Sequence, residues 1–149
     1  MVGLSSRAGR RELESASGRP EPWIVRNGWA LWAVIVLVAS VVPVGWVFGF
    51  AASDDWSWMA GLAHFAEFGV FTALVAVAWS RRHGWSEGLL LGVAAGVGYG
   101  LLIEAVQFPL PYRSSDLRDF ALDVCGVATA ALLLNWARRS RERRRGRRG

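Results

Sequence analysis

Four long stretches of the chain are almost free of charged residues. They span 27–53, 56–80, 88–112 and 120–137, and the last three hold one acidic residue each, Glu67, Glu104 and Asp123. A bilayer core of about 30 Å is crossed by about 20 helical residues, and each stretch is close to that length or longer. The connections between them are short, which favours neighbouring helices that run in opposite directions. The pattern therefore predicts an all-α membrane protein with four transmembrane helices in an antiparallel bundle.

The arginines indicate how this bundle is oriented. All 17 basic residues are arginine, and with both termini in the cytoplasm 15 of them are cytoplasmic and only Arg113 and Arg118 are external. This is the bias that membrane proteins show, and tryptophans cluster near both expected helix ends as well. A cleaved signal peptide is the alternative for the first stretch, but its long leader and long apolar run favour an uncleaved anchor. We expect a multi-pass plasma-membrane protein.

Composition divides the chain into three parts. Residues 1–21 are polar and predict a flexible cytoplasmic leader, 22–137 form the transmembrane domain, and 138–149 form a basic cytoplasmic tail that we expect to be disordered. The formal net charge is +5. Because the arginines flank membrane helices, we expect the tail to contact anionic lipid at the cytoplasmic face, and we expect no nucleic-acid partner. A homo-oligomer is left open.

Glycines recur every fourth residue in the third stretch, at Gly88, Gly92, Gly96 and Gly100. Small residues at this spacing let a second membrane helix approach closely. Four residues exceed one turn of 3.6, so the glycines form a winding ridge along the helix. The ridge predicts close helix packing with Glu104 near the packed side. The alternative is that these glycines reflect only the frequency of glycine in membrane helices.

Polar side chains from three predicted helices and one connection converge near the external side. Counted from the helix ends at 1.5 Å per residue, they lie about 5–15 Å inside the outer boundary. The candidate pocket consists of His64, Glu67, Glu104, Gln107, Arg113, Asp116, Asp119 and Asp123. Each of these residues alone has a structural explanation, such as a helix cap or a buried hydrogen bond, but their convergence favours a functional site.

Charge is costly in hydrocarbon, so these groups are expected to face the bundle interior and to pair. The set is more acidic than basic, which leaves room for protonated carboxyl groups or for a divalent cation; the candidate metal ligands are Glu104, Asp116 and Asp119. No other cofactor is indicated. Arg118 is expected to lie at the rim or to pair with a nearby acid.

The segment IEAVQFPLPYRSSDLRDFALDVCG completes a pattern that resembles the VanZ-like family of small bacterial membrane proteins. The matching positions are His64, Glu104, Gln107, Pro109, Arg113, Asp116, Asp119 and Gly126, within a core of about 56–139. The family usually has Asn where this chain has Asp123, and an Asp or Lys shortly before the His, which this chain lacks. The resemblance implies a cell-envelope role, because the founding member is associated with resistance to the glycopeptide teicoplanin.

The leading hypothesis is that the external pocket binds an anionic lipid headgroup or a lipid-linked cell-wall intermediate. Arg113 would contact the phosphate, since a guanidinium group can bind it bidentately. A membrane enzyme acting on a lipid phosphate or ester is the alternative, with His64 or Glu104 as general base. No nucleophile motif accompanies these residues. An ion-coupled transporter and a non-catalytic accessory or scaffold protein also remain open.

Overall fold

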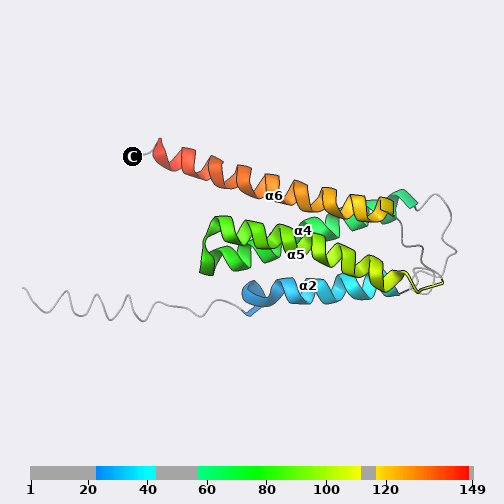
Figure 1. Cartoon of the computed structure of the whole chain (residues 1–149). Coiled ribbons are helices and arrows are strands. Elements are labelled where there is room, and N and C mark those ends of the chain that lie inside the picture. The colour runs from blue at the N-terminus through cyan, green and yellow to red at the C-terminus, as the bar shows by residue number, and fades with distance from the viewer. Residues whose placement is uncertain (1–22, 43–56, 112–116, 148–149) are drawn as a thin grey trace, which may run out of the picture.

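The computed structural model describes residues 23–42, 57–111 and 117–147. Within these ranges the chain forms four α-helices and no strand: α2 (Trp23–Val41), α4 (Ser57–His83), α5 (Trp85–Gln107) and α6 (Leu117–Gly146). Figure 1 shows the four helices lying lengthwise beside one another. The prediction of an all-helical chain is confirmed for this part of the protein. The predicted leader, residues 1–21, lies outside it.

Three of the helices are long and apolar enough to cross a membrane. These spans are Trp58–His83, Trp85–Gln107 and Leu117–Gly146. The apolar part of α2, Arg26–Val41, is shorter. The predicted first span continues to residue 53, and its second half lies outside the described residues. The structure therefore supports three of the four predicted spans and an apolar helix at the place of the first.

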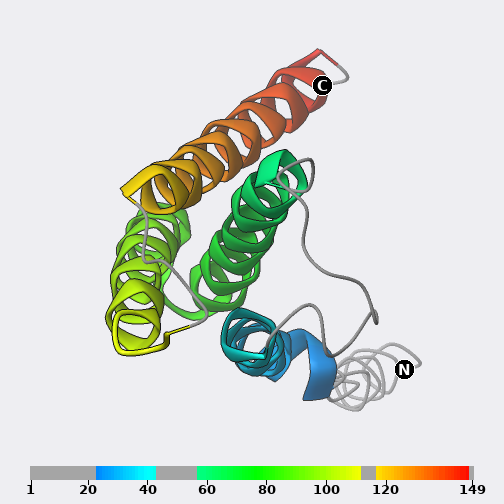
Figure 2. The ribbon, with the colours of Figure 1, turned by 90° about the vertical axis from the view of Figure 1, so that its right-hand side faces the viewer.

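The helices α4 and α5 form the centre of the arrangement. Each contacts the other three helices, whereas α2 and α6 make no contact with each other within the described ranges. Figure 2 shows α2 and α6 on different sides of α4. A tight turn at Gly84 joins α4 to α5, with a φ of 95° that favours glycine. The backbone N–H of Gly84 donates to the Ser80 carbonyl at 3.2 Å, which ends α4.

The predicted glycine ridge is buried along its whole length. At Gly88 a Cβ atom would lie 2.5 Å from the Ser80 nitrogen of α4, and at Gly92 it would lie 2.8 Å from the Ala76 Cβ of the same helix. At Gly96 it would meet both α4 and α6, and at Gly100 it would meet only α6. The ridge therefore winds from one neighbouring helix to the other, as four-residue steps on a 3.6-residue helix require.

Glycines also bring α4 and α6 together. A Cβ atom at Gly126 of α6 would lie 3.0 Å from the carbonyl carbon of Phe65 in α4 and would overlap the carbonyl oxygen. On the other helix, a Cβ atom at Gly69 would lie 3.3 Å from the Gly126 oxygen. Backbone therefore packs directly on backbone here, which small residues permit in membrane helix pairs.

Side chains that bind backbone carbonyls hold α2 in place. The Trp32 indole N–H of α2 donates to the Glu67 carbonyl of α4 at 3.0 Å. In the other direction, the Tyr99 hydroxyl of α5 donates to the Ala33 carbonyl of α2 at 2.5 Å. Such bonds are favourable because an unsatisfied polar group in hydrocarbon is costly.

The buried apolar core is small, and its central cluster takes one residue from each helix: Val36, Phe68, Ile103 and Val127. Phe71 and Val75 of α4 are buried as well. Many large apolar side chains instead point outward, among them Leu90, Leu132 and Trp136. Outward-facing apolar residues along helices of membrane-spanning length are expected when lipid is the surrounding solvent.

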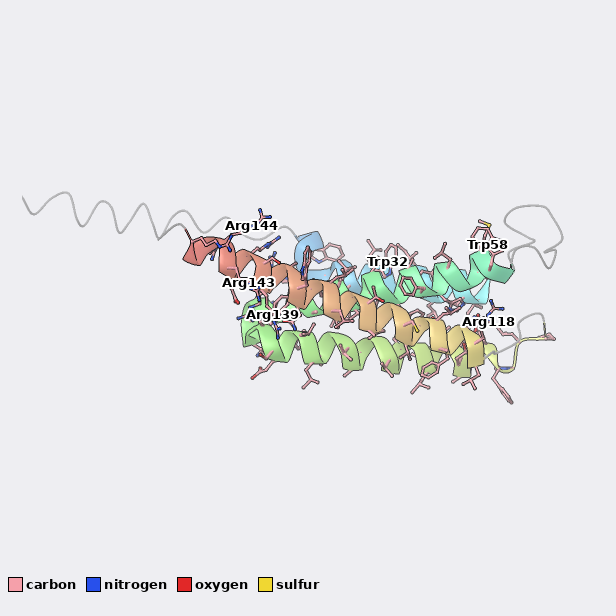
Figure 3. The ribbon with its side chains drawn as sticks, turned by 90° about the horizontal axis from the view of Figure 1, so that it is seen from above. Trp32, Trp58, Arg118, Arg139, Arg143 and Arg144 are labelled. Carbon is pink, nitrogen blue, oxygen red and sulfur yellow. The ribbon has the colours of Figure 1, made fainter. Side chains whose placement is uncertain are left out.

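Residues 138–146, which we expected to be disordered, continue α6 to Gly146. The prediction is wrong for this segment because arginine is a good helix former and a helical pair supports the extension. The Arg138 Nε atom lies 2.7 Å from the Glu142 Oε1 atom, four residues on. In Figure 3 the labelled arginines Arg139, Arg143 and Arg144 lie at one end of the molecule, while Trp58 and Arg118 lie at the other.

Candidate functional site

A histidine and an aspartate meet in the interior between α4 and α6. The Nδ1 atom of His64 lies 3.0 Å from the Oδ1 atom of Asp123, within hydrogen-bonding distance. Both residues are buried, with 6% and 1% of their surface exposed. Because this bond fixes one imidazole nitrogen, it also fixes the orientation of the ring and the direction in which the Nε2 atom points.

An aromatic ring flanks this pair, and one of its carboxylate oxygens is unpaired among the described residues. The Phe68 ring stacks on the imidazole of His64, with centroids 6.3 Å apart and planes 4° apart. The second carboxylate oxygen of Asp123, Oδ2, is buried and has no hydrogen-bond partner among the described residues. It lies beside α5, 3.2 Å from where a Cβ atom of Gly100 would be. Because Gly100 has no side chain, it makes room for the Asp123 carboxylate.

Of the eight predicted pocket residues, the structure joins His64 and Asp123 directly. Gln107 is buried but serves α2: its Nε2 atom donates to the Ser40 carbonyl at 3.1 Å. Asp119 is half-buried one turn before Asp123 on α6.

Two other predicted pocket residues, Glu67 and Glu104, are also half-buried, on α4 and α5. Arg113 and Asp116 lie outside the described residues, so their part in the pocket stays a prediction.

The described residues contain no group of three or more His, Cys, Asp or Glu side chains arranged to hold a metal ion. The predicted ligand set of Glu104, Asp116 and Asp119 includes Asp116, which is not described. A divalent cation at this set therefore remains a prediction.

A groove of about 390 Å³ opens between α4 and α6 at the end of the molecule that we expected to be external. Its lining residues are Trp58, Gly61, Leu62, Phe65, Arg118 and Leu122. Five of them are apolar and one carries a positive charge. The groove adjoins the buried pair along both helices, because His64 precedes Phe65 and Asp123 follows Leu122.

From the sequence, Arg118 was expected to lie at the rim or to pair with a nearby acid, and it was not among the candidate pocket residues. The signal that identifies the groove is spacing: Trp58, Gly61 and Phe65 lie three and four residues apart on one face of α4. Arg118 and Leu122 lie four apart on one face of α6. A small residue at position 61 between two aromatic rings indicates a depression on the helix surface.

Comparison with known proteins agrees with the motifs of the sequence. The family model of VanZ/LLP1 matches residues 14–138, which include all four helices of the described structure up to the start of the arginine-rich end of α6. The match is wider than the core of 56–139 that the motifs alone suggested. No curated protein matches the chain, and no solved structure matches it. The match covers most of the chain, and the protein therefore belongs to the VanZ/LLP1 family.

Proposed function

We propose that this protein is a multi-pass plasma-membrane protein of the bacterial cell envelope, with four helices in an antiparallel bundle and both termini in the cytoplasm. The arginine-rich segments support this orientation. The start of α2, the α4–α5 turn and the end of α6 lie toward one end of the bundle (Figure 1). Nearly all arginines belong to these segments or to the leader, which agrees with the positive-inside rule.

The groove at the opposite end is proposed to bind an anionic lipid headgroup or a lipid-linked cell-wall intermediate. The single observation that carries this proposal is Arg118 in an otherwise apolar groove. A lipid needs both features, because its acyl chains favour an apolar surface while its phosphate favours a guanidinium group. On this proposal both helices that line the groove face lipid, so a lipid could enter it from the bilayer.

The buried pair of His64 and Asp123 favours a second candidate, a membrane enzyme acting on a phosphate or ester of such a lipid. An imidazole held by a carboxylate through Nδ1 presents Nε2 as a proton acceptor, the arrangement of a general base. On this hypothesis the groove holds the substrate next to the base. An accessory or scaffold role would use the same pair only to hold α4 against α6.

Lipid binding by an Arg118→Gln variant tests the leading proposal. We would reconstitute the protein in phosphatidylcholine nanodiscs and titrate in phosphatidylglycerol or a lipid-linked diphosphate. Loss of a charge-assisted contact weakens binding by roughly 1.5–3 kcal/mol, or about tenfold or more. Arg82→Gln is the matched control, because it removes an exposed arginine from the other end. Equal affinity in the Arg118→Gln and Arg82→Gln proteins would overturn the proposal.

Turnover of a candidate lipid substrate by purified protein separates the enzyme from the binding protein. A role in glycopeptide resistance, which the family suggests, is measured separately as the teicoplanin susceptibility of cells with and without the protein. A His64→Gln variant that binds lipid normally but has lost turnover would favour the enzyme.

A further inference from the structure

A second groove, at the arginine-rich end of the molecule, has no part in the proposed external site. It has a volume of about 460 Å³ and lies between α6 and the other two long helices. Its apolar wall includes Val77, Leu134 and Ala137, and its polar wall includes Arg138, Arg141 and Arg145. Glu142 also lines it, so three positive charges and one negative charge leave a net charge of +2.

The three arginines lie on a single face of the helical extension of α6. Arg138, Arg141 and Arg145 are spaced by three and four residues, so their side chains project in the same direction. The remaining described arginines of this segment, Arg139, Arg143 and Arg144, do not line the groove. The groove therefore takes its charge from one face of the helix, and a general excess of arginine does not account for it.

Arg138 is held in position before any ligand binds. Its guanidinium carbon lies 5.4 Å from the centroid of the Trp85 ring, and its Nε atom bonds the Glu142 carboxylate at 2.7 Å. An arginine that is already ordered loses less side-chain entropy when it binds an anion. Trp85 also brings a buried indole N–H with no hydrogen-bond partner in the described part of the chain. Trp85 itself lines the groove, so this unpaired donor belongs to a residue of its wall.

Along the helix axis the groove changes from apolar to basic over the thickness of a lipid headgroup layer. Arg138 and Arg141 lie four and seven residues beyond Leu134, which is about 6 and 10 Å along a helix. The polar region on each side of a bilayer is roughly 5–8 Å thick. With Leu134 at the edge of the hydrocarbon, Arg138 lies within this layer and Arg141 just beyond it. Helical side chains tilt toward the helix N-terminus, so the Arg141 guanidinium group reaches back to the depth of lipid phosphates.

We propose that this groove is a binding site for one anionic phospholipid of the cytoplasmic leaflet. The phosphate contacts the guanidinium groups of Arg138 and Arg141, and the acyl chain lies along Val77 and Leu134. Arg145 lies about 16 Å beyond Leu134 along the helix, on the aqueous side of the headgroup layer, where it adds to the positive potential of the groove. This inference does not depend on the external groove, which lies at the other end of the bundle.

Binding of dihexanoyl phosphatidylglycerol, a short-chain soluble lipid, to full-length protein in neutral detergent tests the inference. All variants carry Arg118→Gln, so that the external groove does not contribute to the signal. The groove variant is Arg138→Gln with Arg141→Gln and Arg145→Gln. Its matched control is Arg139→Gln with Arg143→Gln and Arg144→Gln, which removes the same charge from other faces of the same helix segment.

We expect the groove variant to bind phosphatidylglycerol at least about tenfold more weakly than the control variant, because each arginine near lipid phosphate contributes roughly a factor of five. Equal weakening in both variants would overturn the site in favour of non-specific attraction. Equally tight binding of dihexanoyl phosphatidylcholine would overturn the charge argument. Equally tight binding of inorganic phosphate would show a phosphate site that does not recognise lipid, and would overturn the lipid assignment.

A single pair of variants covers the case in which the triple substitution disturbs the helix. The side chain of Arg141 makes no hydrogen bond or ion pair with any other described residue, so its substitution by Gln removes only charge directed at the groove. We expect Arg141→Gln to weaken phosphatidylglycerol binding about fivefold relative to Arg143→Gln. Equal affinities in this pair would also overturn the inference.

Discussion

The close contact between Gly126 and Phe65 predicts that a larger residue at position 126 destabilises the protein. In a Gly126→Ala variant the added methyl group would lie 3.0 Å from the Phe65 carbonyl carbon and would overlap its oxygen. Both obstructing atoms belong to the backbone of α4, so no side-chain rotation relieves the overlap. Optimal contacts between carbon atoms are about 3.5–4.0 Å, so α4 and α6 must separate by roughly 1 Å.

That separation also affects the buried pair one turn away. The His64–Asp123 distance is 3.0 Å, and an increase of about 1 Å would break the hydrogen bond. Overpacking costs roughly 1–3 kcal/mol, and a buried bond left unmade costs a similar amount. The better helix propensity of alanine offsets about 1 kcal/mol. We expect a net loss of about 3 kcal/mol in the free energy of unfolding.

Denaturant unfolding in detergent micelles, followed by far-ultraviolet circular dichroism, measures this loss. Gly98→Ala is the matched control, because it makes the same substitution within α5 where nothing lies within 4 Å of the added methyl group. We expect the control to be as stable as the natural protein or slightly more stable. If Gly126→Ala and Gly98→Ala unfold at the same denaturant concentration, the close backbone contact between α4 and α6 is refuted.

Three further substitutions test the polar contacts. Asp123→Asn keeps an oxygen that accepts a hydrogen bond from His64, so we expect it to lower the free energy of unfolding by under about 1 kcal/mol. Asp123→Ala removes that oxygen, and we expect a loss of about 2–4 kcal/mol. Equal losses in the same unfolding assay would mean that the charge is essential. Gln107→Leu removes the donor to Ser40, so we expect faster amide hydrogen exchange in the second half of α2. Unchanged exchange there would show that this bond does not hold the helix.

The helices were predictable because each has a strong local signal. The uncharged stretches locate α4, α5 and α6, and the four-residue glycine period indicates which side of α5 is packed. The partners of that side were not predictable. Nothing local indicates that Gly92 packs on α4 while Gly100 packs on α6, since this depends on how the helices are arranged around α5.

The site was predicted as a layer of polar residues, and the pairing within that layer needed the structure. Asp123 is an acid at a position where the family usually has an amide, and the structure shows that its partner is His64. Gln107 has a predicted depth in the membrane similar to that of the other pocket residues, but it lies on the side of α5 that faces α2. Depth follows from counting residues along a helix, but direction around the axis depends on tertiary packing.

The winding of the glycine ridge has a consequence for how the protein assembles in the membrane. In the half of α5 nearest the α4–α5 turn, Gly88 and Gly92 pack on α4, so the close backbone contact of this hairpin can form as soon as both helices are inserted. The other half requires α6, which also brings Asp123 to His64. Until α6 arrives, the hairpin carries a histidine that lacks its carboxylate partner. Because α6 follows the other described helices in the chain, its arrival completes both the packing of α5 and the pairing of His64 with Asp123.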